Sequence, residues 1–182
     1  MNRDEWGTLA TLAVSIGAIM WLYSSGRGTR NNNNATTNNN SSDMSYTKLP
    51  RGYRNNNPLN IRISSANKWQ GEVAQNTDGT FEQFVAMEYG YRAALKLIRN
   101  YANNYGLKTV ADIITKWAPA TENNTAGYIQ RVCNSTGWMP TKQIDPYKVQ
   151  DMADLVYAMA LVENGTTILP DYTQIYKGWE ML

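Results

Sequence analysis

The chain has 182 residues, of which 18% are charged and 42% hydrophobic, and its formal net charge is +2. This length is sufficient for one compact domain with appended segments, and so small a net charge gives no reason to expect nucleic acid as a partner. The chain has no histidine and a single cysteine, Cys133, which excludes Ser-His and Cys-His nucleophile pairs, histidine-containing zinc sites and an internal disulfide. Carboxylates remain as the candidate chemical groups, and neither a metal nor a cofactor is expected.

An uncharged apolar segment occupies residues 6 to 23. At about 1.5 Å per residue, a helix of this length covers roughly 27 Å, close to the hydrocarbon thickness of a bilayer. Trp6 at one end and Trp21 at the other match the aromatic belts of membrane proteins. We therefore expect residues 1 to 23 to be a transmembrane anchor. A cleaved secretory signal is the alternative, but a basic start and a small-x-small cleavage site are both missing.

A polar tract rich in Asn, Ser and Thr follows the apolar segment. Because residues 24 to 43 contain no apolar residue larger than Ala35, they cannot bury enough surface to fold. We expect residues 24 to 44 to be a flexible tether and residues 45 to 182 to be the folded domain. The positive charges on the two sides of the apolar segment differ by one, which leaves the membrane orientation open.

The first third of this domain has the pattern of strands. Apolar and polar residues alternate from Asn60 onward, and the segments WQGEV and TFEQF flank a polar stretch that contains Asp78-Gly79, a typical hairpin turn. We therefore expect a small hairpin or sheet between Asn60 and Phe84.

The apolar period becomes helical from Met87 onward. A first helix is expected to end at Gly106. A second is expected to begin with a capping box formed by Thr109 and Asp112 and to end near Trp117. These helices follow the sheet, so the pattern predicts a mainly helical α+β domain.

Two further helices complete the prediction. One begins at Asn124 or Thr125 and carries Tyr128 on its apolar face. The other is the longest amphipathic segment of the domain. It extends from Asp145, a suitable N-cap, to Gly165, a suitable left-handed residue past the end.

Glu163 occupies an apolar position of that last helix. It follows Val156 by seven residues and Met159 by four, so an acid continues a stripe of core positions. Burial and the negative end of the helix dipole both disfavour the charged form, and a carboxyl that keeps its proton near neutral pH can act as a general acid. The alternative is a helix-terminal Glu that frays into water.

Glu122 is the strongest competing acid, because it lies in the polar run ENNT between two helices and could provide a second carboxylate. Glu72, Glu82 and Glu88 are expected at the surface, since none of them falls within an apolar period.

Two stretches of the domain carry a resemblance to known proteins. RGYRNNNPLNIR, followed by Trp69-Gln70-Gly71 and FEQFVAMEYGYRAALKLIRNY, resembles phage virion-associated proteins of the lysozyme-like peptidoglycan hydrolase or lytic transglycosylase type. So does WAPATENNTAGYIQRV. Together they cover residues 51 to 132, and with the last helix the resemblance extends to about residue 165. One departure is Leu59, where the NNPGNIR pattern of that family has Gly.

The second stretch also resembles the Glu-Thr-x-x-Tyr-x-x-x-Val motif of soluble lytic transglycosylases and goose-type lysozymes. Thr125, Tyr128 and Val132 keep the spacing, whereas Asn124 replaces the Glu. In those enzymes the catalytic Glu closes the first helix, but here the helix that fits comes last. We therefore interpret the domain as a circularly permuted lysozyme-like domain whose residues 156 to 164 replace the usual first helix.

The resemblance implies a membrane-tethered enzyme of the phage particle that cleaves the glycan backbone of peptidoglycan during host entry, as a lytic transglycosylase or a muramidase, with Glu163 as general acid/base. The expected location is the virion membrane or the host inner membrane, with the domain exposed to the wall. Expected partners are glycan strands, the bilayer, and capsid or virion membrane proteins. A non-enzymatic virion protein that binds wall glycan or capsid partners is the alternative. Candidate substrate-binding residues are Tyr128, Trp69, Asn57, Asn60 and Thr125.

Overall fold

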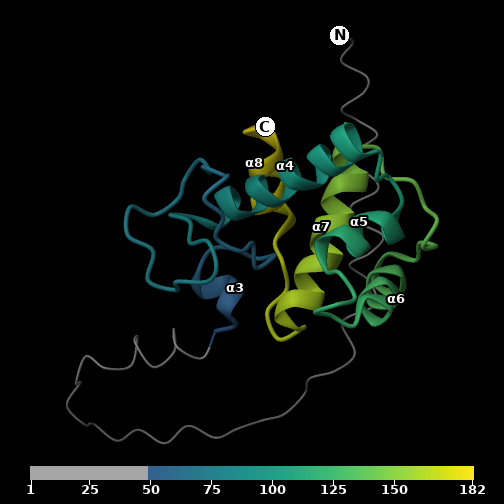
Figure 1. Ribbon diagram of the computed structural model, residues 1–182, viewed down its shortest axis with the longest axis horizontal. Helices are drawn as coiled ribbons and strands as arrows, with labels where there is room; N and C mark the ends of the chain where they lie inside the picture. The colour runs from purple at the N-terminus through teal and green to yellow at the C-terminus, as the bar shows by residue number, and fades with distance from the viewer. Residues whose placement is uncertain (1–48) are drawn as a thin grey trace, which may run out of the picture. The chain divides into compact units, whose positions relative to one another are not determined.

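Six helices and a long irregular segment make up residues 49 to 182, the part of the chain that this computed structural model describes. These residues belong to one compact unit. The helices, shown in Figure 1, are α3 (Arg51–Arg54), α4 (Met87–Tyr105), α5 (Val110–Trp117), α6 (Thr125–Thr136), α7 (Val149–Asn164) and α8 (Tyr172–Glu180).

The expected membrane anchor at residues 6 to 23 and the tether at residues 24 to 44 lie outside the described residues. Within the described part, none of the helices combines the length and the apolar character that crossing a bilayer requires.

Helix α7 forms the centre of the hydrophobic core. It is flanked by α6 and α8, and it also contacts α3 and α4 (Figure 1). Burial extends around most of the helix, beyond the single stripe that the sequence predicts. The side chains that are at most 1% exposed are Met152, Ala153, Leu155, Val156, Ala158, Met159 and Ala160.

The start of α7 differs from the prediction, whereas its end agrees. Asp145 does not cap the helix. Its carboxylate accepts a hydrogen bond from the Tyr147 backbone N–H at 2.9 Å, and its carbonyl accepts one from the Lys148 N–H at 3.1 Å. The carboxylate and the carbonyl of Asp145 are thus both used in a local turn, and α7 begins only at Val149. The helix ends before Gly165 as expected, and its φ of 76° is positive, but its ψ of −173° lies outside the left-handed helical conformation.

The other predicted helix boundaries are confirmed. Helix α4 ends at Gly106, which has φ 66° and the left-handed conformation. Helix α5 begins with the capping box of Thr109 and Asp112. Helix α6 begins after Asn124, whose side chain accepts a hydrogen bond from the Gly127 backbone N–H at 3.0 Å. Each boundary depends on one or two local residues, which explains why the sequence predicts it.

The predicted α+β class is wrong, because the described residues contain no strand. The segment between α3 and α4 has isolated antiparallel bridges, Arg62 with Phe81 and Glu72 with Phe84. The expected turn at Asp78-Gly79 is present, with φ 74° at Gly79, but no ladder extends from it.

Asparagine side chains account for the missing ladder. The Asn57 amide donates to the carbonyl oxygens of Ile61 and Glu82 at 2.9 Å each, and its oxygen accepts from the Ile61 N–H at 2.9 Å. The Asn56 amide donates to the Phe84 carbonyl at 2.9 Å. The Ile61 carbonyl still accepts the Glu82 backbone N–H at 2.9 Å. The Ile61 N–H and the carbonyls of Glu82 and Phe84 are bound by side chains, which limits the pairing to isolated bridges.

This loop is attached to the C-terminal end of α7. The Asn164 amide donates to the Pro58 carbonyl at 2.7 Å, and its oxygen lies against Gly52 of α3 so closely that a Cβ there would be 2.2 Å away. The residue next to Asn164 is Glu163, so the same contact brings the loop to the predicted acid.

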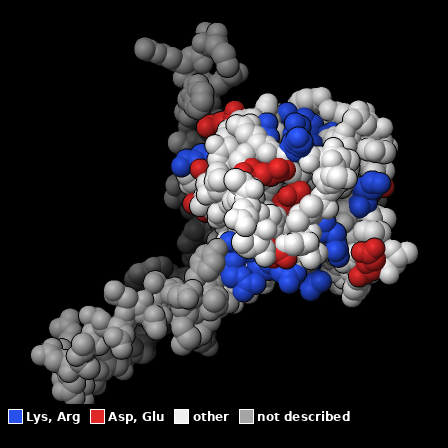
Figure 2. All heavy atoms as spheres, turned by 60° about the vertical axis from the view of Figure 1, so that its left-hand side comes forward, with Lys and Arg blue, Asp and Glu red and all other residues white. Residues whose placement is uncertain are grey.

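Charged side chains of both signs are distributed over the face drawn in Figure 2, with several basic side chains gathered at its lower edge. Most of that face is uncharged, in keeping with the 18% of charged residues in the chain.

Candidate active site

Glu163 lies in the last turn of α7, where three separate parts of the chain meet. Its Oε1 accepts a hydrogen bond from the Tyr128 hydroxyl at 3.0 Å, and its Oε2 accepts one from Asn60 Nδ2 at 3.0 Å. Tyr128 belongs to α6, and Asn60 belongs to the loop between α3 and α4. The carboxyl is therefore held on both oxygens by neutral donors.

Burial raises the pKa of Glu163 above its ordinary range. Hydrogen bonds from the side chains of Asn60, Tyr128 and Trp117 oppose this effect without cancelling it. None of the ion pairs found within residues 49 to 182 includes Glu163. The group is thus a partly buried carboxyl without a basic partner among these residues, an environment that favours the protonated form.

Tyr128 contributes its hydroxyl more than its ring. The residue is only 6% exposed, and its hydroxyl also lies 3.5 Å from the Met159 carbonyl oxygen. Burial, and then the charge of Glu163, raise the pKa of Tyr128 well above its ordinary value, so it remains a donor. The buried ring offers little area for stacking on a sugar, so any contact of Tyr128 with substrate would involve its hydroxyl.

Of the two asparagines expected to bind substrate, the structure brings only Asn60 to the acid. Asn57 is fully buried, and its amide is used by the backbone of Ile61 and Glu82. It therefore shapes the loop that presents Asn60, and it has no free group for a ligand.

Among residues 49 to 182, the hydrogen bonds of Thr125 and Trp69 go to groups other than Glu163. The Thr125 hydroxyl is buried and donates to the Ala118 carbonyl, which ties the start of α6 to the end of α5. Trp69 is partly buried against the core, and its backbone N–H donates to the Glu72 carboxylate. Thr125 is thus structural, while Trp69 retains a partly exposed ring.

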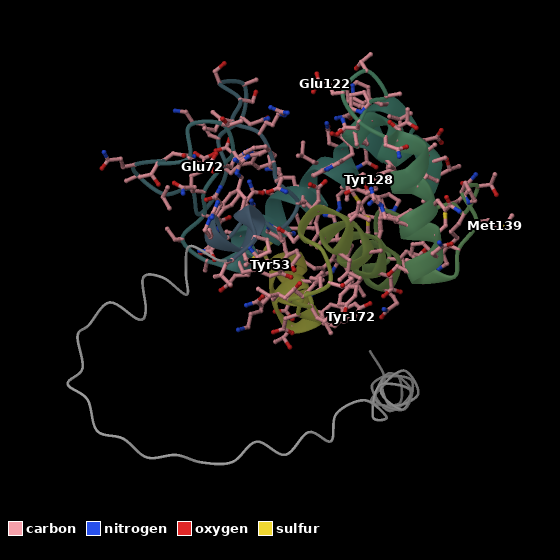
Figure 3. The ribbon with its side chains drawn as sticks, turned by 90° about the horizontal axis from the view of Figure 1, so that it is seen from below. Tyr53, Glu72, Glu122, Tyr128, Met139 and Tyr172 are labelled. Atoms are coloured by element: carbon pink, nitrogen blue, oxygen red, sulfur yellow. The ribbon has the colours of Figure 1, made fainter. Side chains whose placement is uncertain are left out.

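Glu122 is unlike Glu163 in its surroundings. Its side chain is 65% exposed, and its carboxylate lies 3.9 Å from the Arg62 guanidinium. In Figure 3 it lies at the periphery beyond Tyr128. Glu122 is therefore solvated and lies beside a cation, so it lacks the partly buried, cation-free surroundings of Glu163.

Glu82 was expected at the surface, and that expectation is wrong. The residue is only 6% exposed, and burial, followed by the charge of Glu72, raises its pKa. A hydrogen bond from the Ser64 backbone opposes this shift. Its burial results from loop packing between distant segments, for which the local pattern contains no signal.

The raised pKa of Glu163 predicts a pH-dependent stability. Since its pKa in the folded chain exceeds that of the unfolded chain, about 4.3, the stabilisation is complete below that value and is lost as pH rises through the folded-state pKa. Urea denaturation between pH 4 and 8 should show a free energy of unfolding that falls with pH more steeply in the parent than in Glu163→Gln. Parallel curves would mean that the carboxyl is not desolvated.

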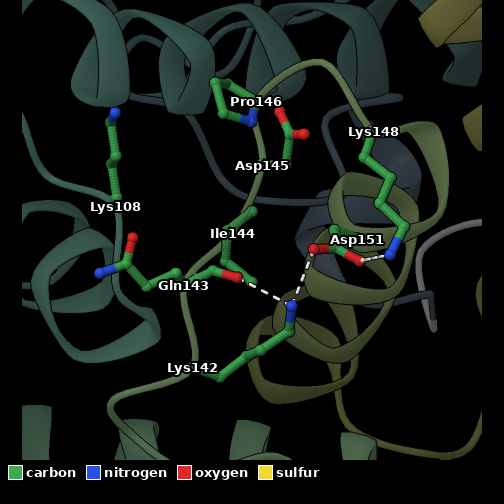
Figure 4. Close-up of a pocket in the computed structure, with 8 residues that line it drawn as sticks. All are labelled: Lys108, Lys142, Gln143, Ile144, Asp145, Pro146, Lys148 and Asp151. Atoms are coloured by element: carbon green, nitrogen blue, oxygen red, sulfur yellow. Dashed lines mark hydrogen bonds and ion pairs between the residues drawn. The ribbon is translucent and has the colours of Figure 1, made fainter.

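A pocket of about 400 Å³ lies at the N-terminal end of α7, away from Glu163 (Figure 4). Its main polar feature is Asp151, which is 6% exposed and accepts hydrogen bonds from Lys142 Nζ at 2.9 Å and Lys148 Nζ at 3.0 Å. Burial raises the pKa of Asp151, but the two ammonium groups outweigh it and the pKa is lowered. The lysines that line this pocket are thus largely used in holding α7. The lining residues are Lys108, Lys142, Gln143, Ile144, Asp145, Pro146, Lys148 and Asp151.

Replacing Asp151 by Asn should lower the free energy of unfolding by about 1–3 kcal/mol at pH 7, because charge-assisted hydrogen bonds to a buried acceptor are lost. With a lowered folded-state pKa, this contribution is present at neutral pH and disappears as pH falls through that pKa. Urea denaturation at pH 7 and pH 3 measures both effects. Asp145→Asn, at an exposed neighbour in the same pocket, is the control and should change stability by less than about 0.5 kcal/mol. Equal losses in both variants would contradict the prediction.

These features define a helical domain in which the partly buried Glu163 is held by neutral side chains from two distant segments. No protein-family model matches the chain. Over 134 residues it is 42% identical to Protein P5 of Pseudoalteromonas phage PM2, and the match covers 71% of this chain and 80% of Protein P5. The chain belongs to the family of this phage protein. The relative supports the bacteriophage context that the sequence suggested.

Proposed function

We propose that this chain is a phage virion enzyme that cleaves the glycan backbone of peptidoglycan, with Glu163 as its general acid and then its base. The observation that carries the proposal is the carboxyl of Glu163, whose pKa is raised by burial and whose two oxygens are held by Asn60 and Tyr128. The phage relative supports the virion context.

The chemistry needs one proton donor beside the glycosidic oxygen. Glu163 gives its proton to that oxygen as the bond to the anomeric carbon breaks, and the N-acetyl group of the same sugar stabilises the anomeric carbon. The Glu163 carboxylate then takes a proton from the attacking hydroxyl, which belongs either to the sugar itself or to water. The first route gives a lytic transglycosylase and the second a muramidase.

The surroundings of Glu122, the strongest competing acid, agree with a mechanism that uses a single protein acid. Two-carboxylate glycosidases need a second acid opposite the first. Glu122 is exposed and paired with Arg62, so it is available neither as a buried acid nor as an unpaired nucleophile.

Incubating the purified chain with isolated peptidoglycan and analysing the soluble products by mass spectrometry tests the proposal. We expect release of sugar fragments by the parent and by Glu122→Gln at similar rates. Anhydro ends on the products would identify a transglycosylase, and reducing ends a muramidase. No release by the parent would reject the enzymatic role and favour a virion protein that binds wall glycan without cutting it.

A further inference from the structure

Within the described residues, only the nitrogen of the Asn60 side-chain amide makes a hydrogen bond, and its oxygen makes none. Its Nδ2 donates to Glu163 Oε2 at 3.0 Å, while its Oδ1 is buried and has no hydrogen-bond partner among residues 49 to 182. A buried acceptor without a donor is destabilising, and native proteins satisfy most such atoms. An unsatisfied acceptor on the same amide that holds the acid therefore needs an explanation.

The backbone at Asn60 limits which residues could stand there. Its φ is 48°, in the left-handed region that Gly, Asn and Asp tolerate best. The conformation is held by a hydrogen bond from the Asn60 N–H to the Asn57 carbonyl at 2.9 Å and by the buried neighbours Leu59 and Ile61. Among the three tolerated residue types, only Asn has a donor for the acid and an acceptor beside it.

We propose that Asn60 is a positioning residue for Glu163 and also a substrate contact, whose Oδ1 accepts a hydrogen bond from a donor on the sugar bound beside the acid. This inference rests on the proposed glycan-cleaving function. The donor is an acetamido N–H or a ring hydroxyl, and either would satisfy the buried oxygen. Because both ends of one rigid amide are then engaged, substrate binding and placement of the acid depend on the same side chain.

The positioning role has a specific pH signature. The hydrogen bond from Asn60 lowers the pKa of Glu163, so its removal raises that pKa further. The titratable side chain that faces Glu163 in the described part is Tyr128 of α6, which remains protonated, and Arg131 of the same helix acts on Tyr128. The high-pH limb of kcat/KM, where the acid loses its proton, therefore reports Glu163.

The chain offers a matched control in Asn56. It has the same φ of 48° and lies in the same loop, but its amide donates to the Phe84 carbonyl and does not contact Glu163. Asn60→Gly should lower kcat/KM by about 10- to 100-fold and move the high-pH limb upward. Asn60→Asp should move the limb further, because it adds a like charge next to the acid. Asn56→Gly should leave the limb in place. A limb that Asn60→Gly does not move would overturn the positioning role.

A binding experiment tests the substrate contact without relying on catalysis. In a Glu163→Gln background of the full chain, calorimetry compares β-1,4 oligomers of N-acetylglucosamine and of glucose, with and without Asn60→Gly. A rise in Kd of about tenfold for the acetylated oligomer alone assigns the acetamido N–H, and an equal rise for both assigns a hydroxyl. Unchanged affinities, or no binding by the background protein, would overturn the contact.

The glycan-cleaving function and the Asn60 contact can be rejected independently. If the parent chain releases no sugar from peptidoglycan but Asn60→Gly weakens oligomer binding, the glycan-cleaving function is rejected while the contact stands. If the parent is active and neither the pH limb nor the affinities respond to Asn60→Gly, the function stands and this inference is rejected.

Discussion

Replacing Glu163 by Gln is expected to lower the rate of glycan cleavage by about 10²- to 10⁴-fold, the contribution typical of a general acid or base. The amide of Gln can still accept from Asn60 Nδ2 and can donate to the Tyr128 hydroxyl oxygen, so the hydrogen bonds around the site are preserved. The loss should therefore arise from the missing proton and not from unfolding. Single-turnover release of soluble fragments from peptidoglycan measures it.

Two controls make that result specific. Circular dichroism of Glu163→Gln should show a fold at least as stable as the parent at pH 7, because a desolvated ionisable group has been removed. Glu122→Gln, which changes an exposed acid, should retain the parent rate. Full activity in Glu163→Gln would reject the assignment and direct attention to another carboxylate.

Replacing Gly90 by Ala is expected to destabilise the domain by about 1–3 kcal/mol, the range typical of overpacking. Helix propensity alone predicts the opposite sign, because Ala is favoured over Gly in a helix interior by roughly 0.8–1.0 kcal/mol. A Cβ at Gly90 of α4, however, would lie 2.1 Å from the Asn56 carbonyl oxygen and 2.8 Å from Pro58 Cδ. Relieving these two close contacts requires movement of the loop that carries Asn60.

Urea denaturation followed by circular dichroism measures this loss, and glycan cleavage should fall with it because the loop presents Asn60 to the acid. Lys96→Ala, at an exposed position of the same helix, is the control and should change stability by less than about 0.5 kcal/mol. A stabilised Gly90→Ala variant would show that the loop and α4 are not in close contact.

The helix boundaries were predictable because their signals are local. Gly106 ends α4 through its own φ, and the capping box of Thr109 and Asp112 needs only four consecutive residues. Asp145 shows the limit of such signals, because its carboxylate was equally able to close a turn and did so. A side chain with two local uses gives an ambiguous pattern.

The sheet was predicted wrongly because alternation describes the residues of a strand but not the partners of its backbone. Between Asn60 and Phe84, the amides of Asn56 and Asn57 bind the carbonyl groups of Phe84 and Glu82, which a neighbouring strand would need. Which of these competing donors reaches a given carbonyl depends on how the loop packs against α4 and α7.

The sequence by itself determined that a carboxylate is the candidate reagent, because histidine is absent, and that Glu163 occupies a core position of the last long helix. Only the tertiary structure decided what holds that acid. Asn60 and Glu163 are 103 residues apart in the chain, and Tyr128 and Glu163 are 35 apart. Periodicity reports on neighbours within one helix, whereas the pKa of a partly buried carboxyl depends on donors that folding brings from elsewhere.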